Sequence, residues 1–119
     1  MTVSWRYYGL KTFIGNVLKD FLRKDAALQA RVDAQLRRMR PLPLPWPITL
    51  FKNLGDGIGE IRVDFRKVEY RFYGFHGSQR FTVIKIGDDK KSEQKTIQAA
   101  KKLKKNLEQN GYEVEEYDV

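Results

Sequence analysis

The fold of this chain is decided by one stretch, Leu54-Gly-Asp-Gly-Ile-Gly-Glu-Ile-Arg-Val-Asp-Phe65, which continues into Val68-Glu-Tyr-Arg-Phe-Tyr73 and Arg80-Phe-Thr-Val-Ile-Lys-Ile86. Apolar and polar residues alternate in all three segments, as they do in half-buried strands. Arg66-Lys67 and His76-Gly-Ser-Gln79 separate the segments and have the composition of hairpin loops. The sequence therefore predicts a three-stranded antiparallel meander, with the glycine-rich start of the stretch forming a turn.

Two amphipathic helices are expected ahead of the meander. Apolar residues recur at helical spacing from Leu10 to Leu22 and again from Leu28 to Met39, and Asp25 stands where it can cap the second helix. Because the connection between them is short, we expect an antiparallel helix hairpin. The four prolines that follow, between 41 and 47, end the second helix and predict a stiff connector that Trp46 anchors to the core.

The two ends of the chain complete the predicted architecture. Val3–Tyr7 alternates and predicts an N-terminal strand, and Ser92 can cap a last helix that ends at Asn110-Gly111. Residues 111–119 form an acidic C-terminal tail with a weak strand pattern. The expected fold class is α+β, in one domain over residues 1–119: N-terminal strand, helix hairpin, three-stranded antiparallel meander, C-terminal helix.

Charge and composition narrow the classes of function. The net charge is +8, although the tail after Asn110 contains four of the fifteen acidic residues and no cation. A body this basic attracts polyanions, so nucleic acid is the favoured partner over ordinary solubility charge or an acidic protein. The chain has no Cys, which excludes disulfides, thiolate metal sites and cysteine nucleophiles. No apolar run resembles a signal peptide or a membrane span, so we expect a cytoplasmic protein without membrane contact.

Four motifs, in order and at suitable intervals, give the chain a family resemblance: Leu54, Gly57-Ile-Gly-Glu-Ile-Arg62, Tyr70-Arg71-Phe72 and Lys90-Lys91. With the predicted order of elements, this pattern resembles the RelE/ParE superfamily of bacterial toxins, and within it the HigB-like, phage-derived branch. The resemblance covers nearly the whole chain. It implies the toxin of a type II toxin–antitoxin pair, an endoribonuclease that cleaves mRNA, commonly on the ribosome, and an antitoxin of the helix-turn-helix type as partner.

The implied reaction is a metal-independent attack of an RNA 2′-hydroxyl on the adjacent phosphate, and no cofactor or metal is expected. Fixed guanidinium groups stabilise the charge that develops on the phosphate, and Arg62 and Arg71 are the expected pair, since both belong to the polar side of neighbouring strands. Lys90 and Lys91 are expected to contact phosphate, or to transfer a proton if desolvation lowers the pKa of one of them.

The acid and base are less defined by sequence. His76 is the single histidine, and its predicted loop position favours a solvated side chain over a proton donor to the leaving oxygen. Tyr73 shares the predicted face of Arg71 and can stack on a base, donate a proton or pack in the core. Glu60 can act as the base, although an ion pair with Arg71 across the sheet is the simpler interpretation.

Further RNA contacts are assigned to Arg80 and to Lys101, Lys102 and Lys105 of the last helix, a run that is equally typical of a solvated face. The acidic tail is a candidate to fold back over this basic surface. A second hypothesis is a non-catalytic phage or mobile-element binding module on the same fold, favoured by Asp88-Asp89 ahead of the lysine pair, where the family usually has an aromatic residue. An RNA-recognition domain fails on the order of its elements.

Overall fold

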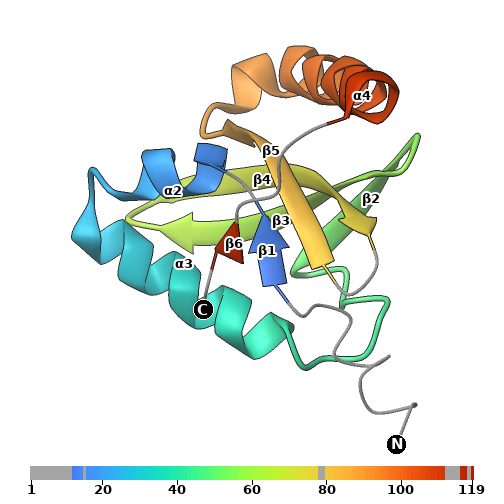
Figure 1. The fold of residues 1–119 in the computed structure, drawn as a ribbon. Helices are drawn as coiled ribbons and strands as arrows, with labels where there is room; N and C mark the ends of the chain where they lie inside the picture. The colour runs from blue at the N-terminus through green and yellow to red at the C-terminus, as the bar shows by residue number, and fades with distance from the viewer. Residues whose placement is uncertain (1–11, 15, 78–79, 112–115, 118) are drawn as a thin grey trace, which may run out of the picture.

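The computed structural model describes residues 12–14, 16–77, 80–111, 116–117 and 119. Figure 1 shows one twisted sheet with helices on both of its faces. The sheet has six strands in the order β2-β3-β4-β5-β1-β6. The α+β class is therefore confirmed, with a four-stranded antiparallel part built from consecutive strands.

The predicted meander is present and gains one strand. Its strands are β3 (Ile58–Phe65), β4 (Val68–Gly77) and β5 (Arg80–Gly87), each antiparallel to the next. The additional strand, β2 (Phe51–Gly55), pairs with β3 across the Asp56-Gly57 turn, so the glycine-rich turn is confirmed. Sequence reasoning missed β2 because it follows the prolines directly and buries few side chains at the edge of the sheet.

The helix hairpin is confirmed except at its start. Helix α2 spans Asn16–Leu22 and α3 spans Ala26–Met39. Asp25 caps α3 as predicted, since its side chain accepts a hydrogen bond from Leu28 N at 3.0 Å. The expectation of helix from Leu10 onward is wrong for Thr12–Ile14, which form β1. The periodic pattern was misleading here because Phe13 and Ile14 of this strand fall by chance at helical spacing from the apolar residues of α2.

Strand β1 pairs with strands that are distant from it in sequence. It runs parallel to β5 and antiparallel to β6 (Glu116–Tyr117). The strand predicted at Val3–Tyr7 lies outside the described residues. The predicted strand in the tail is confirmed for its last part, and the expected cover over the basic helix is not what the described tail residues do: Tyr117 is buried against α3, and the Val119 carbonyl accepts a hydrogen bond from Arg40.

The side chains of the sheet separate into two cores, one on each face. The larger core joins α2, α3 and Trp46 to residues such as Ile61, Val63 and Phe72. The smaller core lies under α4 (Glu93–Asn110) and contains Ile58, Tyr73, Phe75, Ile84, Ile97 and Ala100. The alternation predicted for β3 and β4 is thus confirmed, because apolar and polar positions face different layers.

The connectors at both ends of the meander are well anchored. Trp46 is 4% exposed, and its indole N–H donates to the Met39 carbonyl, which confirms the predicted anchor of the proline connector. Before α4 a short 3₁₀ helix, η1 (Lys90–Ser92), is capped by Asp89. Ser92 stands at the start of α4 as predicted, without a side-chain cap hydrogen bond, and Gly111 ends the helix at a φ of 74°.

The buried hydroxyl of Tyr117 supports a prediction about stability. It donates to Asp33 Oδ1 at 2.6 Å and accepts from Gln29 Nε2 at 3.3 Å, so it joins β6 to α3. Tyr117→Phe should lower the free energy of unfolding by about 1–3 kcal/mol, because Asp33 loses a donor in a partly buried place. Urea denaturation measures this, with Tyr70→Phe as control, which should change stability by less than about 0.5 kcal/mol. Equal effects of the two substitutions would contradict the proposed tie.

Candidate functional site

The charged residues of the meander form rows on the face that α4 covers. Arg62 of β3 lies directly opposite Arg71 of β4, and Arg71 lies opposite Gly87 of β5. The next row toward the β3–β4 turn pairs Asp64 with Glu69. The row on the other side contains Glu60. The two arginines are therefore adjacent and on one face, as the alternation predicted, and acidic rows border them on both sides.

Arg71 lies inside the molecule, between the sheet and the start of α4. Its side chain is 7% exposed, its Nη2 is bound by Glu69, and its Nε faces Glu93 Oε2 at 3.4 Å. The expectation of an open face is therefore wrong for Arg71, since the first turn of α4 covers it. A phosphate would have to displace two carboxylates and the helix to reach this guanidinium, so we assign Arg71 to the attachment of α4.

Arg62 is held differently and stays accessible. Its Nε donates to Glu60 Oε2 at 2.6 Å, and its side chain is 35% exposed, whereas that of Glu60 is 1% exposed. This hydrogen bond raises the pKa of the Arg62 guanidinium, which fixes the positive charge. Among the described residues, no group binds the two terminal nitrogens of Arg62, Nη1 and Nη2. Glu60 therefore pairs with Arg62 on its own strand, and the predicted ion pair of Glu60 with Arg71 is wrong.

Tyr73 is a core residue on the same face. It is fully buried, lies opposite Glu60, and its hydroxyl has no hydrogen-bond partner among the described residues. Burial raises the pKa of Tyr73 to about 12, and the charge of Glu60 acts in the same direction. A phenol in this position cannot stack on a nucleobase at the surface, and of the predicted alternatives packing in the core is the one the structure has.

Lys90 and Lys91 lie in η1, which follows Gly87 at the end of the arginine row. Both are exposed. Asp89, which in the sequence favoured the non-catalytic hypothesis, accepts hydrogen bonds from Lys91 N at 2.9 Å and from the Ser92 hydroxyl at 3.3 Å. The carboxylate is therefore used to cap η1 and to present the two lysines beside the start of α4.

His76 belongs to a different part of the molecule. It lies in β4 and not in the predicted loop, five residues after Arg71, and it packs on the face of the larger core. Its ring is 5.0–5.4 Å from those of Trp46, Phe51 and Phe81, and this desolvation lowers the pKa of the imidazole. With Leu44, Pro45 and Ile48, it lines an apolar pocket of about 460 Å³. His76 is thus on the opposite face of the sheet from both arginines.

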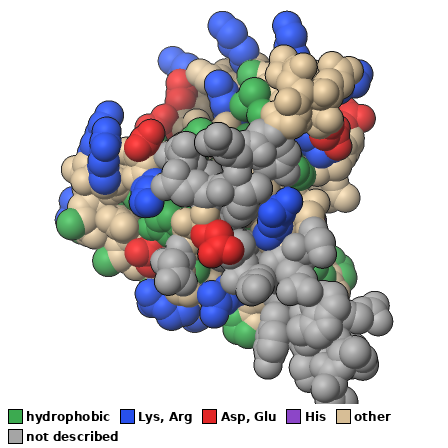
Figure 2. Space-filling model, viewed as in Figure 1, with side chains coloured by type: hydrophobic (Ala, Val, Ile, Leu, Met, Phe, Trp, Pro, Cys, Tyr) green, Lys and Arg blue, Asp and Glu red, His purple; other side chains and the backbone are tan. Residues whose placement is uncertain are grey.

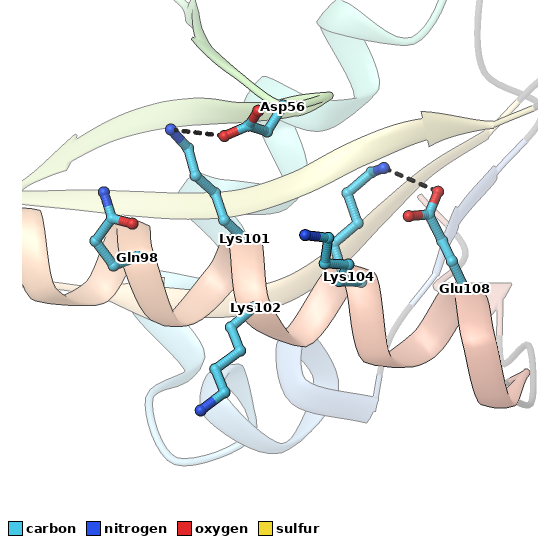
Figure 3. Close-up of a pocket in the computed structure, with 7 residues that line it drawn as sticks. Asp56, Gln98, Lys101, Lys102, Lys104 and Glu108 are labelled. Atoms are coloured by element: carbon cyan, nitrogen blue, oxygen red, sulfur yellow. Dashed lines mark hydrogen bonds and ion pairs between the residues drawn. The ribbon is translucent and has the colours of Figure 1, made fainter.

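The remaining predicted RNA contacts divide between two places. Arg80 begins β5 at the hairpin beside Gly77, at the same end of the sheet as His76. Lys101, Lys102 and Lys105 line a cleft of about 620 Å³ along α4, together with Lys104, Gln98, Asp56 and Glu108. Figure 3 shows Lys101 directed at Asp56 and Lys104 at Glu108, in ion pairs of 3.3 and 2.9 Å. Lysines and arginines also project around α4 in Figure 2.

Comparison of this chain with protein-family models, with curated proteins and with solved structures finds no match. Site assignments therefore depend on the geometry of the chain itself. In the described residues no group of three or more His, Asp or Glu is arranged to hold a metal ion, and no helix is long and apolar enough to cross a membrane.

The arrangement offers one accessible, rigid phosphate ligand rather than an arginine pair. Three carboxylates, Glu60, Glu69 and Glu93, accompany the two guanidinium groups, so the acidic charges of this cluster outnumber its cations and it does not favour an anion as a whole. Arg62, with Lys90 and Lys91 nearby in the fold, is the part that can contact a phosphate. Sequence reasoning paired Glu60 with the wrong arginine and missed Glu69 and Glu93, although Glu60 and Glu69 each stand two residues before an arginine, which in a strand means the same face.

The burial of the carboxylates that are left behind sets the effect of each arginine substitution on stability. Arg62→Ala should lower the free energy of unfolding by about 3–5 kcal/mol, because the 1%-exposed carboxylate of Glu60 loses its cation. Arg71→Ala should lower it by about 1–3 kcal/mol, since Glu69 and Glu93 are 40% and 24% exposed and the main loss is the packing of the Arg71 side chain. Urea denaturation of both variants at pH 7 measures the difference. A cost below about 1 kcal/mol for Arg62→Ala would contradict the burial of Glu60.

The pKa of Tyr73 predicts how stability changes at high pH. A phenol in the unfolded chain ionises near pH 10, whereas Tyr73 in the fold ionises at about 12. The fold favours the neutral form, so the contribution is complete below pH 10 and is lost as the pH rises toward 12, by up to about 1.4 kcal/mol per pH unit. Unfolding free energies of the wild type and Tyr73→Phe between pH 8 and 11.5 test this. Parallel curves for the two proteins would show that Tyr73 is not responsible.

Proposed function

We propose that this chain is the toxin of a type II toxin–antitoxin pair, an mRNA-cleaving endoribonuclease similar to the RelE/HigB-like proteins, with Arg62 as its phosphate ligand. One observation carries the proposal: Arg62 is fixed through Nε by a buried carboxylate while a third of its side chain stays open to solvent. A guanidinium held in this way is ready for a phosphate without reorganisation.

The reaction assigned to this site is an intramolecular transesterification of an RNA phosphodiester. The 2′-hydroxyl loses its proton and attacks the adjacent phosphorus, and the bond to the 5′-oxygen breaks as that oxygen takes up a proton. The products are a 2′,3′-cyclic phosphate and a 5′-hydroxyl end. Arg62 stabilises the negative charge on the phosphate oxygens, and the exposed Lys90 and Lys91 supply further charge and ammonium groups for proton transfer.

A non-catalytic nucleic-acid-binding module is the second candidate. Two observations favour it: Arg71 is buried between carboxylates, and His76 lies on the opposite face of the sheet. Each observation excludes from the site a residue that sequence reasoning had placed in it. The proposed toxin therefore depends on fewer residues than the family resemblance implied.

Growth arrest separates these two functions. Induction of the wild type in bacterial cells should stop growth and produce mRNA fragments with 5′-hydroxyl ends. Arg62→Ala should reduce fragment formation by about a hundredfold or more, as loss of a transition-state ligand does. Lys24→Ala, which removes an exposed cation on the opposite side of the sheet, is the control and should arrest growth like the wild type.

Each outcome decides between the candidates. If the wild type binds RNA but neither arrests growth nor generates fragments, the binding module is correct. If Arg62→Ala arrests growth as strongly as Lys24→Ala, Arg62 is not the phosphate ligand. Circular dichroism of the purified variants confirms that both remain folded.

A further inference from the structure

Two ion pairs fix the direction of α4 across the sheet. Glu93, in the first turn of the helix, binds Arg71, which lies opposite Arg62 near the far end of β3. Lys101, two turns later, binds Asp56 in the turn that precedes β3. The helix therefore crosses the sheet from the Arg71 end of the β3–β4 pair to the turn between β2 and β3. Lys104 packs on the same turn, since a Cβ at Gly57 would lie 3.0 Å from its Cε.

A line of cations follows the flank of α4 that faces β2 and β3. Arg62 stands at one end, and Lys101 and Lys105, one helical turn apart, stand at the other. Lys52 of β2 lies between them, because it pairs with Glu60 and is exposed on the face that α4 covers. From Ile58, just after the turn, to Arg62, the backbone of β3 rises by about 13 Å. We call Arg62, Lys52, Lys101 and Lys105 the flank stripe.

The cleft at the α4 end of the flank stripe has the chemistry of a phosphate site. Lys101 and Lys104 are held by Asp56 and Glu108, and Lys104 also lies 5.5 Å from the centre of the Phe75 ring. Among the described residues Lys102 and Lys105 have no acidic partner, so the cleft keeps an excess of positive charge. Figure 3 shows Lys101, Lys102 and Lys104 along one helix, with Lys102 directed away from the other two.

We infer that the flank stripe is a second RNA-binding site, which holds the phosphodiester backbone of a single strand whose scissile phosphate lies at Arg62. This inference rests on the proposed function for its direction, because Arg62 is the start of the path. The stripe recognises phosphates and not bases, since it presents ammonium groups and no aromatic surface. It therefore supplies affinity that grows with the length of the strand and falls with salt.

The lining of the cleft favours RNA over a protein partner. Its described residues are all polar or charged, whereas the centre of a protein–protein interface is depleted of charge and contains apolar anchors. Lysines at intervals along a ridge match a ligand whose charges also repeat at intervals. The Asp56 carboxylate competes with RNA phosphates for Lys101.

Binding of short oligonucleotides tests the inference without any cleavage. Fluorescence anisotropy is measured with 2′-O-methyl uridine oligomers of nine and of three nucleotides, which lack the attacking hydroxyl. At 50 mM salt, the double variant Lys52→Ala/Lys105→Ala should bind the nonamer more weakly by roughly five- to tenfold for each lysine, and its salt slope should fall by about 1.4. The trimer, whose two phosphates reach only one end of the path at a time, should lose less affinity in this variant than the nonamer does.

Two further variants sharpen the result. Lys24→Ala/Arg37→Ala removes the same charge from exposed positions on the other side of the sheet, and it should bind the nonamer at least threefold more tightly than the stripe variant does. Asp56→Asn should tighten binding about two- to fivefold by releasing Lys101. Asn suits this position, where φ is 54°.

The outcomes are distinct from those of the proposed function. Equal loss in the stripe variant and the control variant, or no loss in either, would overturn the flank stripe. A poly-glutamate peptide of equal charge that binds as tightly as the nonamer, with the same dependence on Lys105, would show an acidic-protein surface and also overturn it. If the wild type fails to arrest growth while the nonamer depends on the stripe, the cleavage proposal fails and the stripe stands.

Discussion

The burial of one guanidinium, that of Arg71, is the constraint on which the rest of this structure depends. A charge removed from water needs partners, and Arg71 takes one from its own strand and one from the first turn of α4. The second partner determines where α4 begins and, with Lys101 and Asp56 at the other end, which way it runs. Few α4 residues are fully buried, so polar contacts contribute a large share of its attachment. The position of every lysine on that helix follows from this.

The same constraint separates the two faces of the sheet by role. The face under α2 and α3 is closed by a continuous apolar core and by Trp46, and its accessible part is the apolar pocket beside His76. The face under α4 combines a small core with rows of alternating charge, and cations reach solvent only along its borders. Arg62 is functional in our proposal and Arg71 structural, although both have the same side chain and lie opposite each other. They differ because α4 covers Arg71 and leaves Arg62 partly exposed to solvent.

Much of the fold was predictable, and the site was predictable only in part. Alternation identified the three long strands, the two faces and the adjacency of Arg62 and Arg71, because those features are local. The cover of Arg71 by Glu93 was not, because it requires knowing where a helix twenty residues later returns to the sheet. His76 was misplaced for an avoidable reason: its odd spacing from Arg71 already puts the two on opposite faces of one strand, but His76 had been assigned to a loop. Strand β2 was not predicted because it directly follows the prolines, and β1 was not predicted because its apolar residues fall at helical spacing.

The pairing of β1 has a consequence for the order of events during synthesis. Strand β1 is made before the meander, yet its partners are β5 and β6, which follow it by more than sixty and a hundred residues. Contacts between residues so distant in sequence are slow to form and are absent until the later segments have left the ribosome. The meander can assemble earlier from neighbouring hairpins, and until β1 pairs with it the outer edge of β5 has no partner strand. A nascent chain therefore passes through an interval in which Arg62 is in place while the sheet still lacks β1 and β6 beside β5.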